Sequence, residues 1–117
     1  MLPHTWVAHH RPGDSELVGY LSPEDSGYRP RTVFGYPLSP VAERAEAVRT
    51  LETRGLASLD EEWTLLAEDG DDLRVQILSA SPERVVVVEA PYGYYEAASP
   101  RFVLPVPTDR LIPASRR

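Results

Sequence analysis

The stretch SPVAERAEAVRTLETRGL (residues 39–56) carries the clearest secondary-structure signal in the chain and decides the fold around it. Ser39 is a favourable helix N-cap, and Pro40 suits the first helical position, where no backbone N–H is needed. An apolar stripe at helical spacing follows, formed by Val41, Ala45, Val48 and Leu51. These features predict a helix that begins at Pro40.

The end of this helix is equally well marked. Gly55 is suited to the left-handed conformation that follows the last helical turn. Leu56 would then fold back onto Leu51, which is the apolar contact that accompanies this type of helix end. The sequence therefore predicts one helix over residues 40–54.

Three short strands are predicted before the helix. Residues 5–10 and 16–21 have strand-like composition and are separated by RPGDS, whose Pro-Gly pair favours a turn. The polar segment SPEDSGYRPR (residues 22–31) is expected to be a loop. TVFGYPL (residues 32–38) is expected to be a third strand that ends or lies at an edge because it contains a proline.

Four strands are predicted after the helix. WTLLA (residues 63–67) and LRVQILSA (residues 73–80) flank EDGDD, in which Asp69-Gly70 predicts a hairpin turn. The unbroken valines of RVVVVEA (residues 84–90) predict a central strand that is covered on both faces. RFVLPVP (residues 101–107) is predicted as the final strand, at an edge where its prolines remove no ladder hydrogen bond.

This order predicts an α+β fold with one central helix. The sheet is expected to be mainly antiparallel and highly twisted, or a partly open small barrel, with about six or seven short strands. Residues 1–113 are expected to form a single domain, and residues 114–117 a flexible C-terminal tail.

Composition excludes several classes of site. The chain of 117 residues has no cysteine, which rules out disulfides, thiolate nucleophiles and thiolate metal sites. No signal-peptide or membrane-span pattern is evident, so we expect a soluble cytoplasmic protein that does not bind membranes. All twelve basic residues are arginine, which is typical of proteins from GC-rich bacteria. The acidic pI of about 5.0 argues against a nucleic-acid partner.

The negative charge is concentrated in residues 57–80. This segment has a single cation, Arg74, and accounts for the whole formal net charge of −6. Such a surface would attract a basic partner and repel phosphate backbones, or it is simply a solvated turn and strand edge. Its acidic residues are Asp60, Glu61, Glu62, Glu68, Asp69, Asp71 and Asp72.

The three histidines all lie near the N-terminus, but their spacing does not predict a metal site. On one strand His9 and His10 point to opposite faces, and His4 and His10 are about 20 Å apart at roughly 3.3 Å per residue. A site would need carboxylates from elsewhere, such as Asp14 or Glu16. We therefore predict no metal and no cofactor, and favour a surface or strand-end role over a catalytic histidine.

The segment APYGYYEAASPRF (residues 90–102) has the most unusual composition in the chain. Tyrosine combines an apolar face with a polar tip, which suits binding surfaces. The rings would form a docking platform, together with Trp6, Tyr20 or Tyr36, or some of them would cap the open end of the core. The candidate binding residues of this segment are Tyr92, Tyr94, Tyr95 and Phe102.

No linear catalytic or nucleotide-binding motif is present, which leaves two functional hypotheses. The first is a non-catalytic protein-interaction or regulatory module that binds itself, as a homodimer, or another protein through the tyrosine-rich loop or a strand edge. The second is a small-molecule-binding protein or enzyme with a pocket between helix and sheet, with His9 or His10 and a carboxylate as polar groups. The aromatic lining of that pocket would be Trp6, Tyr20, Tyr36 and Trp63.

Overall fold

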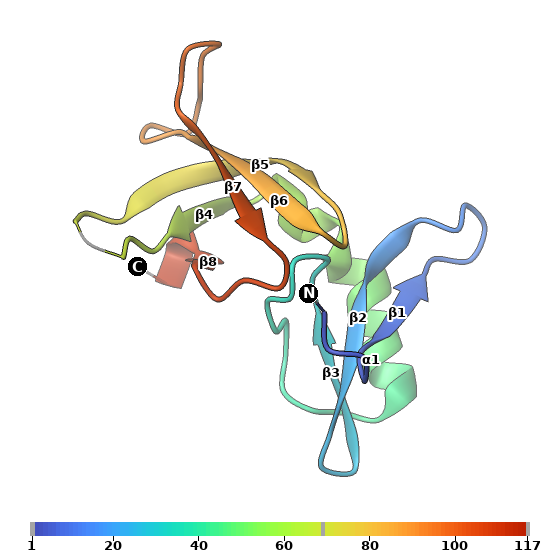
Figure 1. Cartoon of the computed structure of the whole chain (residues 1–117). Coiled ribbons are helices and arrows are strands. Elements are labelled where there is room, and N and C mark those ends of the chain that lie inside the picture. Colours follow the sequence, from blue (N-terminus) through green and yellow to red (C-terminus); the bar gives the residue numbers. More distant parts are fainter. Residues whose placement is uncertain (1, 69, 117) are drawn as a thin grey trace.

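The computed structural model describes residues 2–68 and 70–116 and contains two antiparallel sheets connected by a bent helical segment (Figure 1). The first sheet has the strand order β1-β2-β3, with β1 (Val7–His10), β2 (Leu17–Glu24) and β3 (Gly27–Arg31). The second sheet has the order β7-β6-β5-β4-β8. Its strands are β4 (Glu62–Leu65), β5 (Leu73–Ala80), β6 (Arg84–Glu89), β7 (Arg101–Pro105) and β8 (Leu111–Pro113).

The helical segment joins an α-helix, a π-helical turn and a 3-10 turn. These are α1 (Arg44–Thr50), η1 (Leu51–Gly55) and η2 (Ala57–Asp60), and a further 3-10 turn, η3, is Ala114–Arg116. The predicted α+β class with antiparallel pairing is confirmed, although the strands form two open sheets rather than one sheet or a partly closed barrel. Across residues 2–68 and 70–116, no helix is long and apolar enough to cross a membrane.

The helix begins at Arg44 rather than at the predicted Pro40. The backbone of Ala42 exchanges two hydrogen bonds of 2.9 Å with Tyr28 of β3, which keeps the preceding residues extended. Glu43 therefore takes the N-cap position, with φ −61° and ψ 153°, and its side chain makes no capping hydrogen bond. A strand-like bridge to β3 thus overrides the local N-cap signal.

The predicted helix end at Gly55 is also wrong, because the chain continues through η2 to Asp60. Gly55 is not among the glycines with positive φ. A Cβ at this position would collide with the carbonyl oxygen of Val18 in β2, so the glycine permits close packing of helix on strand. Leu51, at 0% exposure, packs with Val18 in a small core cluster between helix and sheet, and Leu56 packs against that cluster.

The first sheet contains a hairpin that the sequence pattern missed. The predicted loop SPEDSGYRPR forms the end of β2 and all of β3, paired from Tyr20↔Arg31 to Glu24↔Gly27. The predicted strand TVFGYPL is instead a turn, in which Thr32 N–H donates to Tyr36 O over 2.9 Å. Gly35 lies in this turn with φ +99°, a conformation that favours glycine.

The second sheet carries the main core. Phe34 packs edge-on against the fully buried Trp63, with ring centroids 4.9 Å apart. Val87 faces this core, whereas Val88 is buried on the opposite face of β6. The predicted coverage of both faces is therefore confirmed at these two positions, while Val86 stays half-buried.

The C-terminal region extends the second sheet beyond the predicted last strand. β7 lies at one edge as predicted, but β8 pairs with β4 at the other edge, from Leu65↔Leu111 to Trp63↔Pro113. Leu111 is fully buried, so residues 111–113, the last residues of the predicted domain, belong to the core sheet. The predicted turn residue Asp69 and the last residue of the predicted tail, Arg117, lie outside the described residues.

Candidate functional site

The loop between β6 and β7, residues 90–100, is called here the tyrosine loop, and it projects beyond the end of the sheet (Figure 1). Tyr92 is 80% exposed, Tyr94 63% and Tyr95 42%. The rings of Tyr92 and Tyr94 are neighbours, with centroids 6.4 Å apart and planes inclined by 34°. These two rings point to solvent and do not cap the core.

The backbone of the tyrosine loop is held in place although its rings are exposed. Gln76 Nε2 on β5 donates a 2.7 Å hydrogen bond to the carbonyl oxygen of Gly93, which has φ +87°. Arg101 Nη1 donates to the carbonyl oxygens of Ala97 and Ser99, each over 3.0 Å. These hydrogen bonds hold the backbone that carries the exposed rings, which would reduce the backbone entropy lost if the loop bound a partner.

β7 is an edge strand that leaves few backbone hydrogen-bonding groups unpaired at the edge of the sheet. The bond from Glu89 N–H to Pro100 O sets the alternation along the strand, so the backbone groups of Arg101 and Val103 point away from β6. Pro105 points the same way and has no N–H. Phe102 is half-buried against the main core and does not join the exposed rings of the tyrosine loop.

Carboxylates gather beside the tyrosine loop. A Cβ built on Gly93 would lie 3.4 Å from Glu62 Oε1, so the loop backbone passes close to this side chain. Glu62 lies 3.8 Å from Arg74 Nη1 and also lines, with Asp60 and Glu61, a pocket of about 460 Å³. Over residues 2–68 and 70–116, no arginine forms an ion pair with Asp60 or Glu61.

The other predicted aromatic residues lie in a different part of the molecule. Trp6 packs near the buried Tyr20, with centroids 6.1 Å apart, and Tyr36 packs edge-on against Trp63 at 5.3 Å. Among the ring contacts of the described residues, none joins these side chains to the tyrosine loop. The structure therefore divides the predicted platform into two places.

Trp6 and Tyr36 line a pocket of about 450 Å³, called here the seam pocket. It lies where the first sheet meets the second, not between helix and sheet as predicted. Trp63 lies in the core behind Tyr36 rather than in the lining. Its lining includes Trp6, Arg31, Tyr36, Pro107, Asp109 and Ile112.

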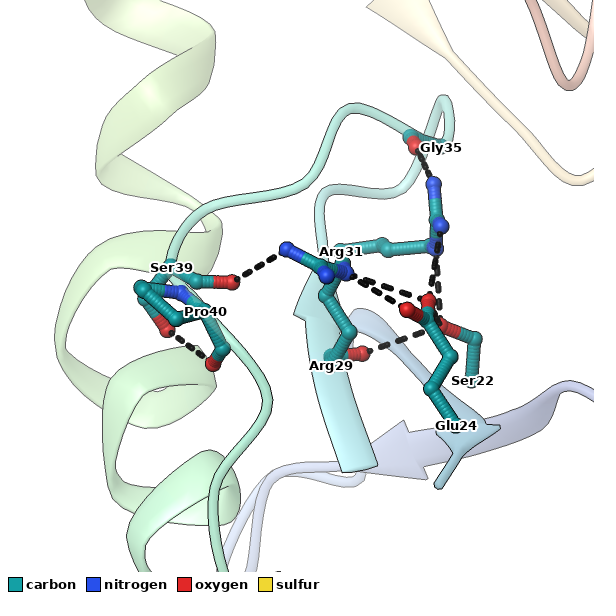
Figure 2. A network of polar contacts seen from close by, with 7 residues as sticks. All are labelled: Ser22, Glu24, Arg29, Arg31, Gly35, Ser39 and Pro40. Atoms are coloured by element: carbon teal, nitrogen blue, oxygen red, sulfur yellow. Dashed lines mark hydrogen bonds and ion pairs between the residues drawn. The ribbon is translucent and has the colours of Figure 1, made fainter. Parts of the chain in front are cut away.

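An ionic network fixes Arg31 at this pocket (Figure 2). Arg31 donates through Nε to Ser22 Oγ over 2.8 Å, through Nη1 to Gly35 O over 2.9 Å, and through Nη2 to Glu24 Oε2 over 3.2 Å. Glu24 also accepts from Arg29 Nε at 3.0 Å. Burial opposes ionisation of Glu24, but the hydrogen bonds from the two arginines outweigh it and lower the pKa of this carboxyl group.

The structure gives His9 a carboxylate neighbour. His9 Nε2 lies 2.8 Å from Glu52 Oε2 of η1, a partner that no local sequence pattern identifies. Asp14 hydrogen-bonds to Arg11 at 2.6 Å, and this bond lowers the pKa of Asp14 to about 2. No group of three histidine or carboxylate side chains within residues 2–68 and 70–116 is placed to hold a metal ion.

Two candidate sites therefore emerge, the tyrosine loop and the seam pocket. Sequence reasoning identified the exposed tyrosines by composition and named two aromatic residues of the pocket. It missed Arg31, because the position of this side chain depends on the β2–β3 register. No family model, no curated protein and no solved structure matches this chain.

Proposed function

We propose that this protein is a non-catalytic protein-interaction module that binds a basic segment of a partner protein at the tyrosine loop. The observation that carries the proposal is the pair of neighbouring, solvent-exposed rings of Tyr92 and Tyr94 on a hydrogen-bonded loop. Tyrosine provides a large contact area at low conformational-entropy cost and is enriched in the centres of protein interfaces.

The charge beside the loop supports a basic partner. Asp60 and Glu61 lie in the same pocket as Glu62, which borders the tyrosine loop at Gly93. Arginine side chains combine a charge for carboxylates with a flat guanidinium that stacks on aromatic rings. A segment with several arginines would therefore engage both parts of this surface.

Two features disfavour the alternative of a homodimer through the same surface. A second copy would bring a chain of net charge −6 against another of the same charge. The β7 edge offers the outward N–H groups of Arg101 and Val103 but none at Pro105, which limits strand pairing between copies. A cytoplasmic location stays part of the proposal, supported by the absence of cysteine.

The test is an NMR titration of the ¹⁵N-labelled full chain with two peptides of equal length. One alternates arginine and glycine, and the other alternates glutamate and glycine. We expect the arginine peptide to shift the amide signals of residues 60–62 and 92–96, with an affinity that falls as salt is added, because charge pairs contribute to binding. The glutamate peptide should cause no saturable shift.

Variants separate the aromatic contribution from general attraction of opposite charges. Tyr92→Ser together with Tyr94→Ser should weaken binding of the arginine peptide about tenfold or more, as expected for interface anchors. Val7→Ser is the matched control, because Val7 is an exposed apolar side chain of the first sheet. Unchanged affinity in the folded double variant, or dimerisation of the parent protein detected by light scattering and lost in that variant, would overturn the proposal.

A further inference from the structure

The seam pocket has flat apolar walls. Two aromatic side chains, Trp6 and Tyr36, and two proline rings, Pro37 and Pro107, contribute to its lining. Its volume of about 450 Å³ falls within the usual range for small-molecule sites, which is roughly 300–1,000 Å³. Flat aromatic and proline side chains give dispersion contact to a ring that lies against them, so this lining favours a planar ligand.

The walls are held by a hydrogen bond and a close packing contact within the protein. Thr108 N–H donates to Phe34 O over 3.3 Å, which ties the β7–β8 loop to the turn that contains Gly35 and Tyr36. A Cβ built on Gly35 would lie 2.9 Å from Pro107 Cβ, so the two segments are in close contact. The pocket is therefore formed before any ligand arrives, which reduces the entropic cost of binding.

Arg31 supplies the polar specificity of the pocket. A guanidinium group has five N–H donors. Within residues 2–68 and 70–116, three of those of Arg31 are engaged, by Ser22 Oγ, Gly35 O and Glu24 Oε2. Two N–H donors are left on a side chain that is 20% exposed and whose guanidinium carbon lies 4.6 Å from the centroid of the Trp6 ring. An acceptor oxygen beside Trp6 would complete the hydrogen bonding of this group.

We infer that the seam pocket binds a planar aromatic ligand that carries a carbonyl oxygen, as an amide or a carboxylate, with Arg31 as the hydrogen-bond donor. This site is separate from the tyrosine loop and does not depend on the proposed protein partner. The two forms of the ligand differ in charge, and Asp109 at the pocket would repel a carboxylate. The amide is therefore expected to bind more tightly than the carboxylate.

The experiment compares three probes of one shape with the ¹⁵N-labelled full chain: indole-3-carboxamide, indole-3-carboxylate and 3-methylindole. We expect saturable shifts at the amides of Gly35, Tyr36, Thr108 and Ile112 for the carboxamide. The 3-methylindole, which has no acceptor oxygen, should bind about tenfold more weakly, as expected when a hydrogen bond to a charged donor is lost. Equal affinity of all three probes, or no saturable shift with any of them, would overturn the assignment.

Two variants locate the effect. Ile112→Phe reduces the volume of the pocket and should weaken every probe, whereas Ile112→Val keeps it open and serves as the control. Arg31→Met removes every N–H donor and keeps an unbranched side chain, so it should remove the preference for the carboxamide. If this last variant does not fold, the three-probe comparison in the parent protein still decides. A preference that survives in folded Arg31→Met contradicts the inferred donor.

Discussion

Replacement of Gly55 by alanine distinguishes two roles for this residue. In a freely exposed helix, alanine stabilises relative to glycine by about 0.5–1 kcal/mol, because glycine loses more backbone entropy on folding. In this protein the added Cβ would collide with the backbone carbonyl of Val18 and approach Val18 Cβ to 3.4 Å. The colliding oxygen belongs to β2, so the helix has to move away from the first sheet.

The magnitude follows from these opposing effects. Overpacking of a tight contact costs about 1–3 kcal/mol, and this displacement also loosens the fully buried Leu51. After the gain in helix propensity, we expect Gly55→Ala to lower the free energy of unfolding by about 1–2 kcal/mol. For a chain of 117 residues this corresponds to a decrease in Tm of roughly 4–8 °C.

The assay is urea unfolding followed by far-UV circular dichroism, with Thr53→Ala as the control. Thr53 is exposed in the same turn as Gly55, so its replacement should change stability by less than about 0.5 kcal/mol. Both variants carry an alanine methyl group in the same helical turn. At position 55 this group contacts the backbone of β2, whereas at position 53 it faces solvent. A Gly55→Ala protein that is as stable as the parent, or more stable, refutes the close-packing argument.

Three further predictions concern stability. Leu111→Ala should lower the free energy of unfolding, measured in urea, by about 2–5 kcal/mol, because Leu111 is fully buried in β8. The same substitution at an exposed position of a loose tail would change it very little. The pKa of Glu24 is lowered from 4.5, so the stability from its ion pairs is complete above that pH and is lost as pH falls through the folded-state pKa. Glu24→Gln should therefore make the free energy of urea unfolding less dependent on pH between about pH 3 and 6. The pair of His9 and Glu52 is partly exposed, so a double-mutant cycle with His9→Gln and Glu52→Gln should give a coupling energy below about 1 kcal/mol. A larger value would show that the two side chains are strongly coupled.

The fold class could be predicted from the sequence because it follows from local patterns. The valines of β6 and the alternation of β5 identify the second sheet without knowledge of its neighbours. β3 could not be found in this way, since its sequence GYRPR is polar and contains a proline. It becomes a strand because Arg29 and Arg31 pair with Glu24 of the adjacent strand and because Ala42 bridges to Tyr28.

One candidate site could likewise be predicted from the sequence, and the other could not. The exposed pair Tyr92 and Tyr94 could be predicted because a cluster of tyrosines in a loop is a compositional signal. The seam pocket could not, because Trp6, Arg31 and Ile112 come from three segments that only the tertiary fold brings together. Its position between the sheets depends on β8, a strand of three residues with too little length for a periodic pattern.

The proline at the outer edge of β7 has a consequence for the solubility of the protein in a crowded cell. The run of four valines in β6 is the kind of segment that nucleates fibrils when a hydrogen-bonding edge is available. β7 separates it from solvent on one side, and the outward backbone of β7 lacks a donor at Pro105. Sheet growth from molecule to molecule is therefore hindered at the strand next to the valines, while the rings of Tyr92 and Tyr94 remain exposed on the tyrosine loop.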